Sequence, residues 1–212
     1  KYDGRFKRNL YTTEIGQIAG RAGRYENNGT FSLLKNAGEL DIKTIQDIED
    51  SNFSSINKIY WRNTSLDFSS IENFLSSLKE YPVHNYFIHK KNASDELNFR
   101  HLIEDQNVKK LLTNQERIKL LWEVCRIPDF QKLFNDSYVQ FLKTIFLLLV
   151  KNEKIPKLWL EKNILGLQNF NGGIEELSLK ISQVRTWTYI SNHQNWIDNE
   201  KYWQEITQKI EN

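Results

Sequence analysis

The chain has 212 residues, of which 39% are hydrophobic and 13% aromatic, so it can bury a real core as one large or two small domains. Its net charge is only +2, which excludes a global electrostatic field that would draw in nucleic acid. The sole cysteine, Cys125, excludes an internal disulfide and any cysteine-based metal cluster.

A helix is predicted near the start of the chain, with a cap at Thr12 or Thr13 and an end at Gly23 and Arg24. Its apolar positions recur at helical spacing and should pack on a core: Ile15, Ile18, Ala19 and Ala22. The opposite side carries an amide and two guanidiniums: Gln17, Arg21 and Arg24.

Two glycines, Gly20 and Gly23, interrupt this helix beside the arginines. Each weakens a helix by ~1 kcal/mol relative to alanine, but each also removes bulk, so that a large ligand can approach the backbone. Guanidinium groups match the oxygens of a phosphate, and two of them with cleared space between suit a polyphosphate.

The stretch Gln17–Arg24, Q-I-A-G-R-A-G-R, resembles the sixth motif of superfamily-two helicases. It is most similar to the Suv-three type of RNA helicase, known from the mitochondrial RNA-degrading complex and from bacterial relatives. The flanking stretches agree with that group: Lys1-Tyr2-Asp3-Gly4, Glu14-Ile15-Gly16 and Asn28-Gly29-Thr30-Phe31. The resemblance is strong over about the first 35 residues and weaker from about residue 40 to 135.

The resemblance implies that residues 1–38 are the end of a second RecA-like domain, in which the motif helix is followed by a short strand at residues 30–34. It implies that Arg21 and Arg24 contact the γ-phosphate of ATP as arginine fingers, while Gln17 orients the attacking water. Gly20 belongs to the same nucleotide-binding motif. The ATP, with Mg²⁺, would be held mainly by the other RecA-like domain.

The same resemblance implies partners and a location. The substrate would be RNA or another single-stranded nucleic acid, and an RNA-degrading nuclease would be a partner. The protein would act in a bacterial cytoplasm or in the mitochondrial matrix, with no membrane involved. The longest apolar run, six residues from Ile145, is too short to cross a bilayer.

Neither a G-x-x-x-x-G-K-[ST] phosphate loop nor a D-E-x-[DH] box is present, and the sequence contains no methionine. We therefore expect a C-terminal fragment of a longer helicase that cannot hydrolyse ATP by itself. The alternative is a non-catalytic helical interaction or RNA-binding module, in which the arginines of the motif are solvated or bind a partner.

From Asp41 onward the apolar period is helical, which predicts a multi-helix bundle over residues 39–212 and a mainly α chain. Residues 136–151 are apolar on most sides and should form the central helix. The other predicted elements follow in chain order: a helix capped by Asp41, a short strand or extended linker at 57–62, a helix capped by Asp67 and ended before Pro82, and helices that open at Ser94, Thr113, Pro156, Ile174 and just before Tyr202.

Two other groups of residues in the predicted bundle are candidates for a binding site. Arg185 and Trp187 offer a cation and an aromatic ring on which an RNA base could stack, although packing is the usual role of tryptophan in a helical domain. The four histidines show no zinc-ligand spacing with another ligand, so no metal site is predicted.

Overall fold

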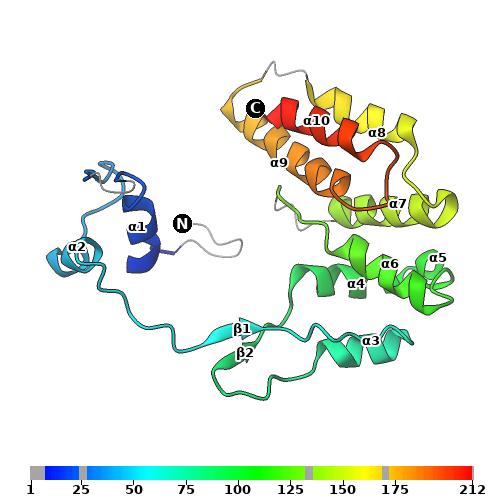
Figure 1. The fold of residues 1–212 in the computed structure, drawn as a ribbon, viewed down its shortest axis with the longest axis horizontal. Helices are drawn as coiled ribbons and strands as arrows, with labels where there is room; N and C mark the ends of the chain where they lie inside the picture. Colours follow the sequence, from blue (N-terminus) through cyan, green and yellow to red (C-terminus); the bar gives the residue numbers. More distant parts are fainter. Residues whose placement is uncertain (1–7, 24–27, 132–135, 169–171, 212) are drawn as a thin grey trace. The chain divides into compact units, whose positions relative to one another are not determined.

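The computed structural model describes residues 8–23, 28–131, 136–168 and 172–211. The chain divides into two compact units, residues 1–59 (the N-terminal unit) and residues 60–212 (the helical unit), coloured blue to cyan and cyan to red in Figure 1. The described residues are mainly helical, as predicted, with ten α-helices, one 3₁₀-helix and a two-stranded sheet.

In the N-terminal unit, helix α1 (Thr12–Ala19) packs against helix α2 (Ile42–Glu49). The Asp41 cap is confirmed, because its Oδ1 accepts the backbone N–H of Thr44 at 2.9 Å. Because α2 packs on α1, the units divide after residue 59, whereas the sequence placed the boundary after residue 38. The strand predicted at residues 30–34 is absent, since these residues find no neighbouring strand among the described residues of the unit.

The helical unit begins with a small parallel sheet of β1 (Ile59–Trp61) and β2 (Phe87–His89), joined through helix α3 (Ile71–Leu78). Of the two alternatives predicted for residues 57–62, a short strand or an extended linker, the structure has the strand, at Ile59–Trp61; β2 was not predicted. Helix α3 begins at Ser70, whose Oγ accepts the N–H of Asn73 at 3.0 Å. The predicted cap at Asp67 was wrong, because that carboxylate accepts the N–H of Ser69 in the preceding turn instead.

The remaining helices follow the predicted order. They are α4 (Ser94–Glu104), α5 (Gln106–Lys109), α6 (Gln115–Cys125), α7 (Asp136–Asn152), α8 (Lys157–Ile164), the 3₁₀-helix η1 (Leu165–Gln168), α9 (Ile174–Ser191) and α10 (Glu200–Glu211). The one-turn helix α5 and the 3₁₀-helix η1 lack a sequence prediction; the cap of α5, Asp105, also pairs with Lys143 of α7. Helices α9 and α10 lie side by side as a hairpin (Figure 1), and the amide of Gln204 donates to the carbonyl of Ser191 at 3.1 Å.

Helix α7 supplies the centre of the core, as predicted. Its side chains Leu142, Ile145 and Phe146 are fully buried. Two aromatic clusters complete the core: Phe74 of α3, Phe99 of α4 and Trp122 of α6 form one, and Phe141 of α7, Trp159 of α8 and Trp187 of α9 form the other. Aromatic pairs of this kind add about 0.5–1.5 kcal/mol each beyond the area that they bury.

Truncation of a buried side chain on helix α7 should show how far the fold depends on this helix. We expect Leu142→Ala to lower the free energy of unfolding by about 2–5 kcal/mol, because it leaves a cavity among fully buried side chains. Leu158→Ala makes the same chemical change at a side chain that is 81% exposed, so it should alter stability by less than about 0.5 kcal/mol. Urea unfolding followed by circular dichroism measures both, and equal losses would contradict this account of the core.

Candidate functional site

The start of α1 is held by a charged contact that precedes the predicted motif. The guanidinium of Arg8 donates to both carboxylate oxygens of Glu14, at 2.7 and 2.8 Å, and lies 4.4 Å from the centroid of the Tyr11 ring. The N–H of Tyr11 also donates to Glu14, at 3.0 Å, so Tyr11 rather than Thr12 or Thr13 is the N-cap. A glutamate in the first turn is also favoured by the helix dipole.

Helix α1 ends earlier than the sequence predicted. It stops at Ala19, and the N–H of Gly20 closes the last turn on the carbonyl of Gly16 at 2.8 Å. The chain then continues in a looser turn, in which the N–H of Arg21 donates to the carbonyl of Ile18 at 3.2 Å. Glycine has a low helix propensity, and α1 has no buried residue whose packing would offset it.

The predicted site residues therefore lie on two elements. Gln17 is exposed on α1, and Arg21 is exposed on the turn that follows it. The guanidinium of Arg21 makes no hydrogen bond or ion pair with any residue that the structure describes. Arg24 lies outside the described residues, so the predicted side-by-side placement of two guanidiniums stays a prediction.

The apolar side of α1 is only partly covered. Ile15 and Ala19 are half-buried, whereas Ile18 is 59% exposed. The ring of Phe53, which follows α2, lies directly over Gly16, where a Cβ would come within 2.5 Å of it. The predicted packing of this stripe on a core is thus limited to the contact with α2 and Phe53.

Gly29 packs tightly against the turn that carries Arg21. The sequence pattern points only to Gly20 and Gly23 as the glycines that shape this turn. A Cβ at Gly29 would lie 2.2 Å from the backbone carbonyl carbon of Ala22, whereas a Cβ at Gly20 would meet only the carbonyl oxygen of Gly16, at 3.2 Å. The closeness of Gly29 to backbone atoms means that only a glycine fits at this position.

We expect Gly29→Ala to displace the turn from Gly20 to Gly23, because backbone atoms cannot yield as a flexible side chain can. The backbone amide resonances of Arg21 and Gly23 in a heteronuclear NMR spectrum should shift strongly. Gly166→Ala is the matched control, since nothing lies within 4 Å of a Cβ there. Unchanged Arg21 and Gly23 resonances in Gly29→Ala would contradict the contact.

The second predicted pair, Arg185 and Trp187, does not come together. Arg185 is exposed on α9, and its Nε donates to Glu211 at 3.0 Å. Trp187 is buried against Phe141 and Trp159. Two residues apart on a helix, the side chains point to different sides, which explains the separation.

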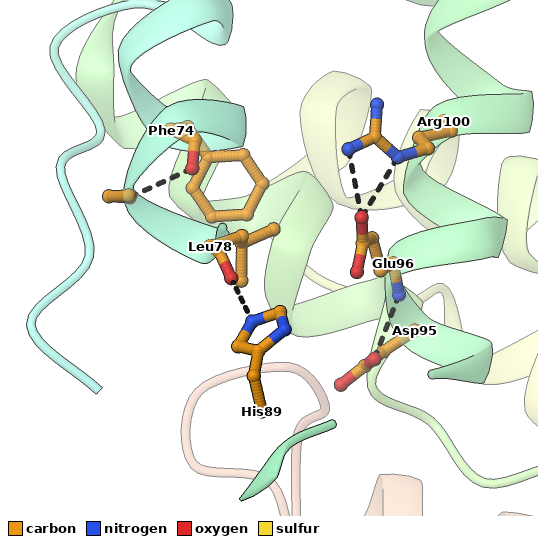
Figure 2. A network of polar contacts seen from close by, with 7 residues as sticks. Phe74, Leu78, His89, Asp95, Glu96 and Arg100 are labelled. Carbon is orange, nitrogen blue, oxygen red and sulfur yellow. Dashed lines mark hydrogen bonds and ion pairs between the residues drawn. The ribbon is translucent and has the colours of Figure 1, made fainter. Parts of the chain in front are cut away.

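A polar network in the helical unit was not predicted. Arg62 follows β1, and its Nη1 donates to both oxygens of Asp95 at the start of α4, at 2.9 and 2.7 Å. Its guanidinium lies 5.5 Å from the centroid of the Trp122 ring. One turn along α4, Arg100 donates to Glu96 at 2.8 and 3.0 Å (Figure 2).

His89, the last residue of β2, ties the sheet to α3. Its Nε2 lies 3.0 Å from the carbonyl oxygen of Leu78, so Nε2 carries the proton and donates (Figure 2). The other ring nitrogen, Nδ1, and the Nη2 of Arg62 are buried without a hydrogen-bond partner among the described residues. The network therefore braces the sheet against α3 and α4, and it leaves one acceptor and one donor unused.

We expect Asp95→Ala to lower the free energy of unfolding by about 1–3 kcal/mol, because it leaves the half-buried guanidinium of Arg62 without its carboxylate. Asp198→Ala removes a carboxylate from an exposed pair with Lys154, whose N–O distance is 2.6 Å, and should cause no measurable change. Thermal unfolding measures both variants. A loss no larger than that of the control would show that the network does not brace the fold.

Neither a thiol nucleophile nor a metal centre emerges from the described residues. Cys125 is buried, and burial raises the pKa of its thiol well above the ordinary value, with a smaller contribution from the Asp95 carboxylate. Within the described ranges, no three His, Cys, Asp or Glu side chains gather as a metal site would require. Nor does any helix of this part of the chain combine the length and the apolar character that crossing a bilayer demands.

Comparison of the chain with protein-family models, with curated proteins and with solved structures gave no significant match.

Proposed function

We propose that this chain is the C-terminal part of an ATP-dependent RNA helicase of superfamily two. In this proposal Arg21 and Arg24 contact the γ-phosphate of ATP, and Gln17 orients the attacking water. ATP and Mg²⁺ are bound mainly by another part of the enzyme. The helical unit helps to enclose an RNA strand or another single-stranded nucleic acid.

The observation that carries the proposal is the state of Arg21. Its side chain is exposed on the turn after α1, four positions beyond the exposed Gln17, and it forms no ion pair with a described carboxylate. A guanidinium in this state keeps its full set of N–H donors for a phosphate group. In the transition state of phosphoryl transfer, charge spreads over the phosphoryl oxygens, so a cation in that position lowers the barrier.

A second observation concerns apolar surface in the N-terminal unit. Leu34 is 84% exposed and Ile56 is 83% exposed, while Ile48 is the one buried hydrophobic side chain among the described residues of the unit. The described part of the unit therefore has little core of its own, and several of its large apolar side chains face solvent. We propose that the rest of a RecA-like domain covers this surface in the intact enzyme.

The remaining parts of the proposal follow from the motif resemblance alone. They are an RNA-degrading nuclease as a partner, a location in a bacterial cytoplasm or in the mitochondrial matrix, and the use of DNA as a second substrate. The membership of Gly20 in the nucleotide-binding motif has the same basis.

The arginines can be tested in the intact protein. We expect Arg21→Ala and Arg24→Ala each to lower the rate of ATP hydrolysis by about 10³-fold or more, because an arginine finger stabilises charge that develops only in the transition state. RNA binding, measured by fluorescence anisotropy, should change little. Arg126→Ala, at an exposed arginine of the helical unit, is the matched control and should hydrolyse ATP at the wild-type rate.

Normal turnover in both motif variants would contradict the helicase proposal. It would favour a non-catalytic helical interaction or RNA-binding module, and one observation supports that alternative. The helical unit buries a continuous core of its own, so it has what a separately folding module requires. Such a module has no ATPase activity, so the motif variants would weaken only the binding of a partner.

A further inference from the structure

The helical unit contains a cavity that neither the motif nor the polar network uses. Its volume is about 230 Å³, and its walls come from the segment after α6 and from α7, α8, η1 and α9. Pockets for drug-sized ligands are larger, about 300–1,000 Å³. The cavity therefore suits a ligand of about one fused ring system.

Two aromatic rings form one side of this cavity. Phe141 of α7 and Trp187 of α9 meet at 90°, with their centroids 5.7 Å apart. Phe141 is only half-buried, so part of its ring remains open to a ligand. A planar group stacked on Phe141 would meet Trp187 edge to face, and both arrangements are favourable for aromatic groups.

Three carboxamides from three different segments face the same cavity: Gln131, Asn163 and Gln183. The side chains of Gln131 and Gln183 make no hydrogen bond with the described residues. Asn163 uses its Nδ2 to donate to the carbonyl of Trp159 at 2.7 Å, which leaves its Oδ1 as an acceptor. Each free carboxamide offers a donor and an acceptor in one plane, and half-buried polar groups of this kind gain most from a partner.

Aromatic rings and carboxamides in one cavity together favour one class of ligand. The carboxamide of Asn or Gln pairs in bidentate fashion with the amino group N6 and the ring nitrogen N7 of adenine. Aromatic side chains stack on the faces of unpaired bases. We propose that this cavity binds one adenine base, either as a free nucleoside or as an unstacked base of single-stranded RNA.

The proposal is independent of the ATP site proposed for the N-terminal unit. The proposed site uses only residues of the helical unit. In it the base lies against Phe141, with its polar edge toward Gln183 and Gln131. Asp129 also lines the cavity, but the proposal does not depend on it.

The full chain can be titrated with adenosine by isothermal titration calorimetry, with the indole N–H resonance of Trp187 as a local probe. We expect one site per chain and a shift of that resonance. Gln183→Leu, which removes the carboxamide at nearly constant size, should weaken binding by about fivefold to tenfold. Phe141→Leu should weaken it by about tenfold or more through loss of stacking.

Gln140→Leu is the matched control, because Gln140 is exposed on α7 and does not line the cavity. It should bind adenosine as the wild-type chain does, and so should Arg21→Ala, which separates this result from the fate of the ATP-site proposal. Thermal unfolding of each variant verifies that it is folded.

An eight-nucleotide oligoadenylate RNA distinguishes the two sources of the base. Tighter binding of the RNA than of adenosine, with the same losses in Gln183→Leu and Phe141→Leu, assigns the cavity to an RNA strand. Binding of adenosine without binding of the RNA assigns it to a free nucleoside. Absence of both, equal affinity for cytidine, or equal affinities of Gln183→Leu and Gln140→Leu would overturn the proposal.

Discussion

Burial of the apolar side chains of helix α7 is the constraint on which the helical unit depends. Leu142, Ile145 and Phe146 have no exposed surface; α4 and α6 pack on this helix, and its Phe141 ring contacts Trp159 of α8 and Trp187 of α9. Each fully buried side chain of this size contributes about 1.5–3 kcal/mol relative to an exposed one. The buried side chains of α7 belong to the same cluster as those of the helices before and after it, so the two aromatic clusters are parts of one core.

The N-terminal unit contrasts with this arrangement. Helix α1 buries none of its residues, and the contact that holds it to the rest of the unit is the packing of Gly16 under the ring of Phe53 together with α2. Local contacts at its start, between Arg8, Glu14 and Tyr11, fix the first turn. Nothing comparable among the described residues fixes its end, where glycine lets the helix open into the turn that carries Arg21.

That difference bears on function. A side chain that is to meet a nucleotide must keep its donors free, and a guanidinium that already lies against a carboxylate has used them. Arg62, Arg100 and Arg185 are all paired with carboxylates, whereas Arg21 is not paired with any described residue. These three arginines of the helical unit thus hold contacts within the fold, whereas the guanidinium of Arg21 stays exposed.

Local sequence patterns determined most of the helices of this protein. The Asp41 cap, the break before Pro82 and the apolar period of residues 136–151 depend on residues within a few positions of one another, so they could be recognised in the chain. The mainly helical class and the central place of α7 followed from them. Gln17 and Arg21 were likewise singled out by spacing alone, and both are exposed as a ligand contact requires.

Only the tertiary structure decided the features that join distant segments. Strand β2 exists because β1 lies beside it, and residues 30–34 form no strand because the described residues offer them no partner. Arg62 meets Asp95 across 33 positions, and the three carboxamides of the cavity come from three segments. No local sequence pattern predicts such long-range contacts, because they depend on how the helices pack. The early end of α1 also depends on tertiary structure: propensity alone left its length open, and none of its residues is buried in a core that would offset the glycines.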